Sequence, residues 1–391
     1  MQRLSRFIAF GYIALCLAVL AGTFALGPLG YAPLPLVAAP VRQPVVLTIW
    51  YGSEKKEWLD AARQRFLASN PSVNGRPIQI QLQSLGSREI AERLLNQDWR
   101  GAAPPTVVSP ASALWLDALN APIVRAGADA PRSLVLSPLV LVGWEQRAQA
   151  LWPRGPADFW KDLQAALAND AGWQALGGQQ SWGLVKFGHT SPLSSNSGAQ
   201  ALILLAYGFY GKSSGLSAAD VGNPALASWL RPVEAAVPSF SDSTAALMDD
   251  IVRAGPAKYD FGVVYENLAL QNMDAARQRQ GQALHIYYPP ATILSDHPYA
   301  LVDGAWVQAD ERAAAARFRD YLLGREAQQL ALRYGFRPAD PGVSIADASP
   351  DNPFGKYAAN GASAAIGAQA ETPPADVLNA LLGLWQSKFK R

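Results

Sequence analysis

Strand-like and helix-like patterns alternate along this chain, and this alternation limits the folds open to it. Val45–Tyr51 is rich in β-branched and aromatic residues, and Gly52-Ser53 ends this strand pattern just before apolar residues at helical spacing. Strand-like residues 78–82 and 106–108 are followed by helix starts in the same way. Repeated units of this kind predict an α/β fold whose sheets are mostly parallel, with helices on both faces.

The second half of the chain repeats the pattern. Ser133–Trp144 is too apolar for a surface loop and predicts a long buried strand. In Gly183–Gly198 a short strand ends in a loop of five hydroxyl side chains and one amide, and this loop opens a long apolar helix. Phe261–Val264 predicts another strand that runs directly into a helix. We therefore expect two α/β lobes rather than one continuous sheet.

Four of these strand ends carry hydroxyl, amide or carboxyl side chains immediately before a helix. Ligands of open α/β sheets bind at the carboxyl ends of strands, where helix N-termini present unpaired N–H groups. Helix capping explains each turn taken singly. Four such turns, two in each half of the chain, favour a ligand cleft between two lobes. The candidate ligand-binding residues are Ser53, Glu54, Ser109, Ser112, Thr190, Ser194, Ser195, Asn196, Ser197, Tyr265, Glu266 and Tyr288.

Glu266 bears on the charge of the ligand. A carboxylate at a helix N-terminus complements the helix dipole and often does nothing more. If Glu266 faces the cleft, it repels a doubly charged oxyanion and favours a cationic or hydroxyl-rich ligand. The sequence leaves these two roles open.

Composition excludes several classes of function. The formal net charge is +2 and like charges form no long run, so we expect no nucleic-acid partner. The chain has three histidines and one cysteine, without HExxH or CxxC spacing, so we expect no metal site and no cofactor. Cys16 has no intrachain disulfide partner.

The N-terminal residues carry a membrane-targeting pattern. Arg3 and Arg6 precede Phe7–Leu26, an uncharged and mostly apolar stretch long enough to span a bilayer as a helix. Positive residues before the span place the bulk of the chain outside the cytoplasm. We expect a signal anchor over residues 1–27 that holds the protein at the inner membrane, and a proline-rich linker over 28–44. A cleaved signal peptide that releases the domain into the periplasm is the alternative.

The order of motifs resembles a known family. The segments are YGSEKKEW, PTVVSPASALW, FGHTSPLSSNSG, VVYENLAL, IYYPPATILSDHPYALV and YGFRP. This ordered set is similar to the bacterial extracellular (periplasmic) solute-binding proteins of class II, the sulfate- and molybdate-type fold, over about Val45 to Arg391. Some relatives carry this domain together with a von Willebrand A module, but no DxSxS metal motif of such a module occurs here.

The resemblance implies a two-lobed architecture and its partners. Crossing segments, here Ser133–Trp144 and Pro289–Val302, would join the lobes and close them over a ligand. Residues 45–135 and 300–391 would form lobe 1, and residues 136–299 would form lobe 2. The expected partners are a small-molecule solute and a membrane transporter of the ABC type or a von Willebrand A-type protein.

The function predicted from the sequence is therefore extracytoplasmic solute binding without catalysis, for transport or sensing. An oxyanion is one candidate solute. Two alternatives stay open. One is a serine hydrolase that uses His189 with Ser194 or Ser195, although the chain lacks the GxSxG elbow. The other is a partner-docking ectodomain whose cleft is vestigial.

Overall fold

The computed structural model describes residues 11–18, 21, 42–117, 124 and 129–390. Two units divide the chain, residues 1–44 and residues 45–391. In the first unit, residues 11–18 are helical. None of the helices among the described residues combines the length and the apolarity that a bilayer span requires. Most of the predicted anchor over Phe7–Leu26, and most of the predicted linker over 28–44, lie outside the described residues.

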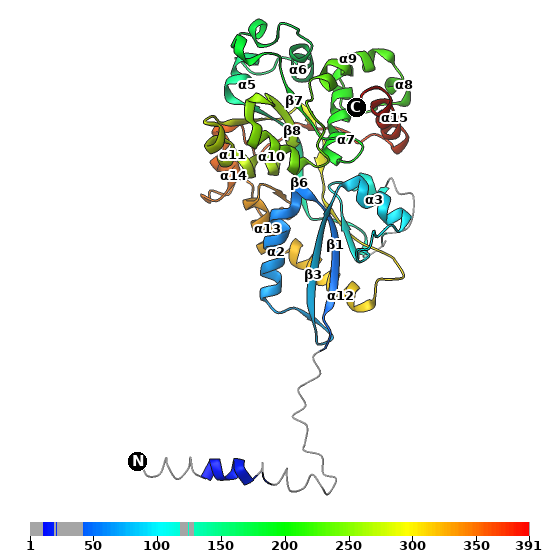
Figure 1. Cartoon of the computed structure of the whole chain (residues 1–391), viewed down its shortest axis with the longest axis vertical. Coiled ribbons are helices and arrows are strands. Elements are labelled where there is room, and N and C mark those ends of the chain that lie inside the picture. The colour runs from blue at the N-terminus through cyan, green and yellow to red at the C-terminus, as the bar shows by residue number, and fades with distance from the viewer. Residues whose placement is uncertain (1–10, 19–20, 22–41, 118–123, 125–128, 391) are drawn as a thin grey trace, which may run out of the picture. The chain divides into compact units, whose positions relative to one another are not determined.

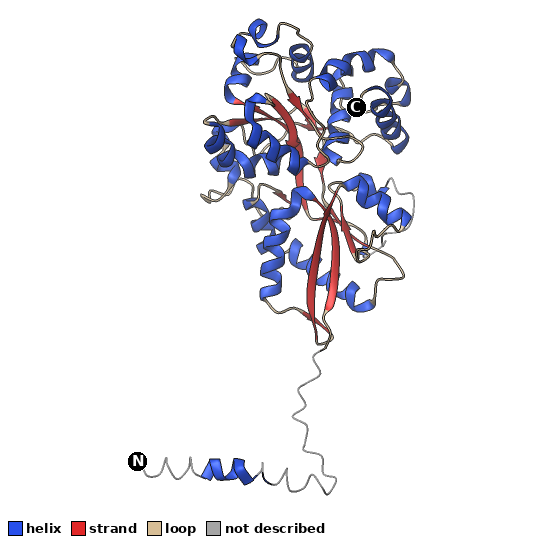
Figure 2. Cartoon of the chain, in the orientation of Figure 1, coloured by secondary structure: helices blue, strands red, loops and turns tan. Residues whose placement is uncertain are grey.

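The second unit holds two sheets, and the first is built around β1 (Figure 1). The strands run in the order β2-β3-β1-β4-β12-β5, and helices lie on both faces (Figure 2). The strands are β1 (Val45–Gly52), β2 (Ser72–Val73), β3 (Arg76–Leu85), β4 (Val107–Ser109), β5 (Arg132–Ser133) and β12 (Pro298–Leu301). The helices are η2 (Ser53–Lys55), α2 (Lys56–Ala68), α3 (Ser87–Asn96), α4 (Leu114–Asp117), α12 (Ala309–Leu323) and α13 (Arg325–Arg333).

Side chains of β1 point alternately to the two faces of the sheet, so this lobe has an apolar core on each face. Leu47 and Ile49 face one side, where they join a cluster that includes Trp58 of α2 and Phe318 of α12. Trp50 faces the other side and belongs to a larger cluster, which runs without interruption into the second lobe. On that side, therefore, the two lobes share buried apolar side chains.

The second sheet is built around β6, the long apolar strand predicted from the sequence. It pairs with β8, β9, β11 and β13, and β7 pairs with β8. The strands are β6 (Val135–Trp144), β7 (Phe187–Gly188), β8 (Phe261–Tyr265), β9 (Leu284–Tyr287), β11 (Leu294–Ser295) and β13 (Arg337–Pro338), with β10 (Ala291–Thr292) and β14 (Ala368–Gln369) as a separate pair.

Helices cover the second sheet on both faces (Figure 2). They are α5 (Glu145–Leu151), α6 (Phe159–Leu167), η4 (Gly172–Leu176), η5 (Gln180–Trp182), α7 (Asn196–Tyr210), α8 (Ala218–Val221), α9 (Pro224–Ala235), α10 (Thr244–Ala254), η6 (Gly255–Ala257), α11 (Glu266–Gln280), α14 (Pro353–Lys356), η7 (Ala358–Asn360) and α15 (Ala375–Lys388).

The expectation of mostly parallel sheets holds for the central strands of the first sheet and is wrong for the second sheet. In the first lobe β1 is parallel to β3 and β4, but β12 runs antiparallel to both of its neighbours. In the second lobe β6 is antiparallel to every strand it pairs with, while β7–β8 and the separate pair β10–β14 are parallel. A helical crossover returns the chain to a parallel position. Strands β6 and β12 instead enter their lobes directly from the other lobe, so no such crossover sets their direction.

The chain passes between the lobes near residues 134, 296 and 336. Because it returns to the second lobe at the third of these points, the C-terminal lobe boundary differs from the expected one. Residues 300–391 were expected in lobe 1, and α12 and α13 do pack against β1 and α2. Beyond β13, however, β14 pairs with β10 and α15 packs on α7 and α8 (Figure 1). Trp385 of α15 also donates a 2.8 Å hydrogen bond to Glu234 of α9. The C-terminal segment therefore belongs to lobe 2.

A fully buried carboxylate holds one end of the second lobe together. Asp260 accepts hydrogen bonds from Arg147 Nε at 2.8 Å, from Trp173 Nε1 at 3.0 Å and from the Lys186 backbone N–H at 2.8 Å. The Arg147 guanidinium also lies 3.4 Å from the centre of the Trp182 ring. Asp260 thus connects α5, η4 and the start of β8.

We expect Asp260→Ala to lower the free energy of unfolding by about 3–5 kcal/mol, because the substitution leaves the Arg147 charge buried without its partner. Urea unfolding at neutral pH measures this change. Asp320→Ala is the matched control, since that carboxylate is 68% exposed, and we expect it to stay within about 0.5 kcal/mol of the parent. Equal losses in the two variants would contradict the role of Asp260.

Candidate functional site

Helix N-termini from both lobes meet at one small cavity, which we call the interlobe pocket. Among the described residues, five of its lining residues are the N-caps of helices η2, α3, α7, α10 and α11. This follows from the local fold, because β1, β3 and β8 end at the point where the next helix begins. The complete lining is Gly52, Ser53, Glu54, Leu85, Gly86, Ser87, Ser195, Asn196, Asp242, Ser243, Thr244 and Tyr265.

Several of these helix starts are left without a side-chain cap. The N-cap residues Gly52, Gly86 and Ser195 make no side-chain cap hydrogen bond, whereas Ser243 accepts one from Ala246 N–H at 3.3 Å. First-turn N–H groups have no partner within their own helix. The interlobe pocket is therefore a place where backbone donors from two lobes are available to a bound group.

A buried group of three charged or titratable side chains lies at the edge of the pocket. Lys55 Nζ donates to Glu54 Oε1 at 2.6 Å and to the Pro110 carbonyl at 3.2 Å, and it lies 3.3 Å from His297 Nδ1. Lys55 and His297 are fully buried, and the Glu54 side chain is 4% exposed. We call this group the Glu54 cluster.

Electrostatics fix the charges of the Glu54 cluster. Burial alone would raise the pKa of Glu54, but the Lys55 ammonium and the His297 ring outweigh it and lower that pKa to about 2. Burial and the nearby Lys55 charge both lower the pKa of His297. Burial also lowers the pKa of Lys55, and the Glu54 carboxylate opposes that shift. At neutral pH, Glu54 is thus an anion beside Lys55, and His297 is uncharged.

Hydroxyl side chains form a second buried network behind the pocket. Thr190 and Ser197 hydroxyls lie 2.7 Å apart, Ser197 and Thr244 hydroxyls 2.6 Å, and Ser195 and Ser197 hydroxyls 3.2 Å. Thr190 and Ser197 do not line the pocket among the described residues. Their hydroxyls are used in packing the start of α7 against α10.

Asn196 ties the two lobes together. Its Oδ1 accepts from Trp115 Nε1 of the first lobe at 2.7 Å, and its Nδ2 donates to Tyr265 OH at 2.7 Å. A second link is the 3.0 Å bond from Asn267 Nδ2 to the Glu54 carbonyl. The lobes are therefore hydrogen-bonded to each other directly at the pocket.

Glu266 and Tyr288 do not occupy the place that the sequence analysis gave them. Arg337 donates to both carboxylate oxygens of Glu266, at 2.7 Å each, and Tyr288 OH donates to it at 2.5 Å. Glu266 is fully buried in this arrangement, and neither residue is among the residues that line the pocket. A ligand-facing Glu266 stays a prediction; in this structure its carboxylate is engaged by an arginine from a strand 71 residues further along the chain.

The remaining predicted residues divide between the pocket and its surroundings. Ser53, Glu54, Ser195, Asn196 and Tyr265 line the interlobe pocket. Ser194 lines a neighbouring cavity of about 450 Å³, the side cavity, and donates to Asp242 at 3.2 Å. Ser112 accepts from Leu114 N–H, and the buried Ser109 hydroxyl has no hydrogen-bond partner among the described residues. These two serines do not line the pocket.

The sequence analysis missed several residues of the site. Ser87, Asp242, Ser243 and Thr244 line the pocket, and each precedes or opens a helix. The segment SFSDST has the same hydroxyl-rich pattern as the turns that were selected, so this signal was present. Lys55 and His297 carry no such signal, because only the fold brings them together.

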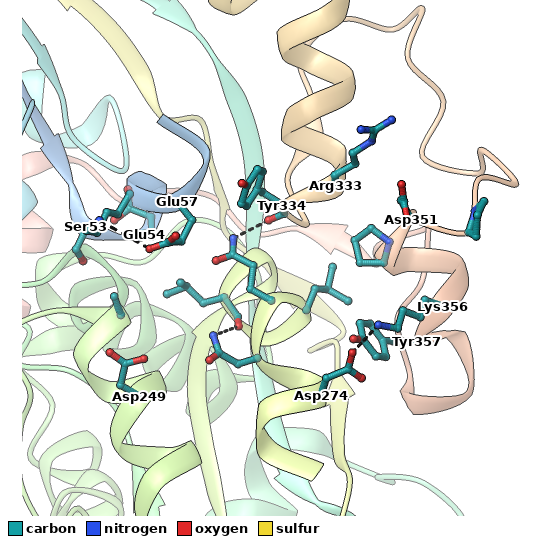
Figure 3. Close-up of a pocket in the computed structure, with 18 residues that line it drawn as sticks. Ser53, Glu54, Glu57, Asp249, Asp274, Arg333, Tyr334, Asp351, Lys356 and Tyr357 are labelled. Carbon is teal, nitrogen blue, oxygen red and sulfur yellow. Dashed lines mark hydrogen bonds and ion pairs between the residues drawn. The ribbon is translucent and has the colours of Figure 1, made fainter. Parts of the chain in front are cut away.

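A larger cavity opens on the other side of Ser53 and Glu54. This outer cavity has a volume of about 760 Å³ and lies between the start of α2 and helices α10, α11 and α14. Figure 3 shows carboxylates around it, including Glu57, Asp249 and Asp351. Asp274 in its wall is paired with Lys356 at 2.5 Å (Figure 3). The interlobe pocket itself holds only about 10 Å³, which is the space of a single water.

The hydrogen-bond partners of His189 in the described part of the chain are not serines. Its Nδ1 lies 2.9 Å from the Thr190 carbonyl, and its Nε2 lies 3.1 Å from Glu234 Oε2. Both ring nitrogens are thus used by acceptors, and the ring is fully buried. This geometry gives the serine hydrolase alternative no support, because a general base must reach the hydroxyl proton.

Comparison with known proteins identifies related chains. Residues 47–337 match a family described as bacterial extracellular solute-binding protein. Uncharacterized proteins from two strains of Mycobacterium tuberculosis are each 27% identical over 299 residues, covering 70% of this chain and 39% of the relative. The chain therefore spans about two-fifths of the length of these curated relatives.

Solved structures share the fold. A sulfate-binding protein from Mycobacterium tuberculosis is 21% identical with a TM-score of 0.52, covering 88% of this chain and 98% of that chain. A periplasmic thiamin binding protein is 12% identical with a TM-score of 0.61, covering 89% and 97%. An iron-bound protein from Pseudomonas aeruginosa is 15% identical with a TM-score of 0.55, covering 88% and 99%.

The His189–Glu234 pair predicts a pH dependence of stability. Burial alone would lower the pKa of His189, but the Glu234 carboxylate outweighs it and raises that pKa above its usual value. A raised pKa in the folded state contributes stability that is complete below the unfolded value of about 6.5 and is lost as pH rises through the folded value. We expect unfolding free energy, measured in urea from pH 5.5 to 9, to fall across this window and to fall less in His189→Gln. Parallel profiles for the two proteins would contradict this assignment.

Proposed function

Because this chain belongs to the family of bacterial extracellular solute-binding proteins, we propose that it captures a small solute between its two lobes, outside the cytoplasm, without chemically changing it. The resemblance drawn from the ordered motifs is confirmed by the family match, and the two-lobed fold by its structural neighbours. The convergence of helix N-termini from both lobes on the interlobe pocket carries the proposal.

Solute entry requires the lobes to separate. A ligand cavity usually measures about 300–1,000 Å³, whereas the interlobe pocket measures about 10 Å³. The side cavity and the outer cavity flank it, and Ser53 lines all three. Opening the direct bonds made by Asn196 and Asn267 would merge these spaces. We propose a hinge motion about the three interlobe passages as the binding movement.

We propose that the protein delivers its bound solute to a membrane transporter of the ABC type. Sensing of the solute, with the same lobe movement as the signal, is the second proposed purpose of binding. A von Willebrand A-type partner stays a prediction from the sequence. The partner-docking alternative has one observation in its favour, namely that the chain's own side chains nearly fill the interlobe pocket.

A thermal-shift screen of the purified protein with sugars, polyols, amines and oxyanions tests the proposal. A bound solute at a hundredfold excess over its dissociation constant stabilises the folded state by about 2.7 kcal/mol. We expect Ser53→Ala to weaken binding of the solute found by about twofold to tenfold, because one neutral hydrogen bond contributes about 0.5–1.5 kcal/mol.

Ser197→Ala is the control for this measurement, because the Ser197 hydroxyl lies in the network behind the pocket. It should lower the melting temperature while leaving the affinity within about twofold. If no solute shifts the melting temperature, the partner-docking alternative replaces solute binding. If Ser197→Ala weakens binding as much as Ser53→Ala, the site lies deeper than proposed.

We further propose that the apolar residues Phe7–Leu26 hold the full-length protein at the inner membrane with residues 45–391 on its outer side. In cell fractionation the full chain should stay in the membrane pellet after an alkaline carbonate wash. A chain that begins at residue 45 and is exported by an unrelated cleavable signal should appear in the periplasmic fraction. Release of the full chain by the wash would point to a cleaved signal peptide instead.

A further inference from the structure

Glu54 is an acidic residue in the lining of the pocket where helix N-termini converge. Glu54 lines the interlobe pocket together with the N-cap residues of the converging helices. Its side chain folds back over the end of β1: a Cβ added to Gly52 would lie 2.5 Å from Glu54 Oε1 and 2.7 Å from Oε2. Glycine at position 52 is therefore what gives the carboxylate room at the strand end.

This carboxylate is held by its sequence neighbour Lys55 and by His297 from a distant segment. Lys55 Nζ is 2.6 Å from Oε1, and His297 Nδ1 is 3.3 Å from the same oxygen. The three side chains are at most 4% exposed. Because Lys55 is occupied by Glu54 and by the Pro110 carbonyl, it is not available to a second anion.

The other charged residue of the pocket lining is also acidic, and the outer cavity beside it has more acidic than basic residues. Asp242 is the second charged residue of the lining, and neither lysine nor arginine is among the described residues that line it. The outer cavity next to it is lined by five acidic residues, Glu54, Glu57, Asp249, Asp274 and Asp351, and by three basic ones, Lys56, Arg333 and Lys356. An anion that approached the pocket by this side would meet a surplus of negative charge.

From these contacts we infer that Glu54 selects the charge of the solute: it is a fixed negative charge in the lining where the helix N-termini converge, so the pocket excludes oxyanions such as sulfate and takes an uncharged, hydroxyl-bearing solute. Hydroxyl groups suit this surface because they accept from the uncapped N–H groups and donate to Glu54 and Asp242. This inference rests on the proposed function, since it concerns the same pocket. It gives Glu54 the charge-selecting role that the sequence analysis considered for Glu266 in case that residue faced the cleft.

Removing the charge of Glu54 should convert the pocket into an oxyanion site. In Glu54→Gln the pocket lining loses this negative charge, and the Lys55 ammonium loses its partner. We expect sulfate, titrated calorimetrically at low ionic strength, to bind this variant at least about tenfold more tightly than the parent, the gain expected for one charge-assisted hydrogen bond. Glu326→Gln is the matched control, because the Glu326 side chain is 66% exposed and contacts Arg65 instead of the pocket.

A second variant protects the test against misfolding. Glu54→Gln leaves Lys55 buried without its anion, so the double variant Glu54→Gln/Lys55→Met removes both charges at similar volume. Circular dichroism and the melting temperature show which variants fold. Tighter sulfate binding by at least about tenfold in a folded variant, with no change in Glu326→Gln, supports the inference. Folded variants that bind sulfate no more tightly than the parent overturn it, as does a parent that already binds sulfate at micromolar concentration.

The sulfate titration of the Glu54 variants and the solute screen of the parent protein can fail independently. If no solute stabilises the parent protein, solute binding itself fails, while a sulfate gain in Glu54→Gln still demonstrates the role of Glu54. If the screen finds an uncharged hydroxyl-bearing solute, both proposals stand. If the best solute of the parent carries net charge, the ligand class inferred here is overturned while solute binding stands.

Discussion

The buried ion pair between Glu54 and Lys55 is the interaction on which the organisation of the lobes depends. Lys55 Nζ also bonds the Pro110 carbonyl after β4 and lies beside His297 at the passage into β12. The Glu54 carbonyl accepts from Asn267 of α11 in the other lobe. One adjacent pair of residues therefore joins the ends of β1 and β4, an interlobe passage and the second lobe. Because a buried charge without its partner is strongly destabilising, these segments are committed to one arrangement.

Placing this pair among helix N-termini has a physical consequence for binding. Uncapped N–H groups attract negative charge, and a cleft lined with them needs an occupant or water when it closes. Here the lobes are in direct contact: Trp115 donates a hydrogen bond to Asn196 across them. The pocket that remains, with Glu54 in its lining, has the space of one water. The protein thus satisfies by itself part of the polar surface that a solute would otherwise cover. Any solute must offer more than these internal contacts in order to bind.

Much of the fold could be predicted from the sequence because it is local. The strand pattern of Val45–Tyr51 and the hydroxyl-rich turn before α7 are read from consecutive residues, and both elements are present. The same reasoning found Ser53 and Asn196 at the pocket, since both sit where a strand or loop meets a helix. It also selected Thr190 and Ser197, which do not line the pocket among the described residues: their hydroxyls contact each other, and that of Ser197 also contacts Thr244. A hydroxyl that serves packing and one that faces a ligand look alike in a sequence.

By itself, the sequence determined the α/β alternation, the position of polar turns at strand ends and the resemblance to a family, because periodicity and turn chemistry act over a few residues. Only the tertiary structure decided which carboxylate faces the pocket. Glu266 is neutralised by Arg337, which follows it by 71 residues in the sequence. Glu54 is held by its neighbour Lys55 and by His297, and these two residues are 242 positions apart in the sequence. It also decided that α15 packs on α7 and that β6 runs antiparallel to its partners. Contacts between segments so far apart produce no periodic pattern in the sequence, because each partner alone is compatible with many folds.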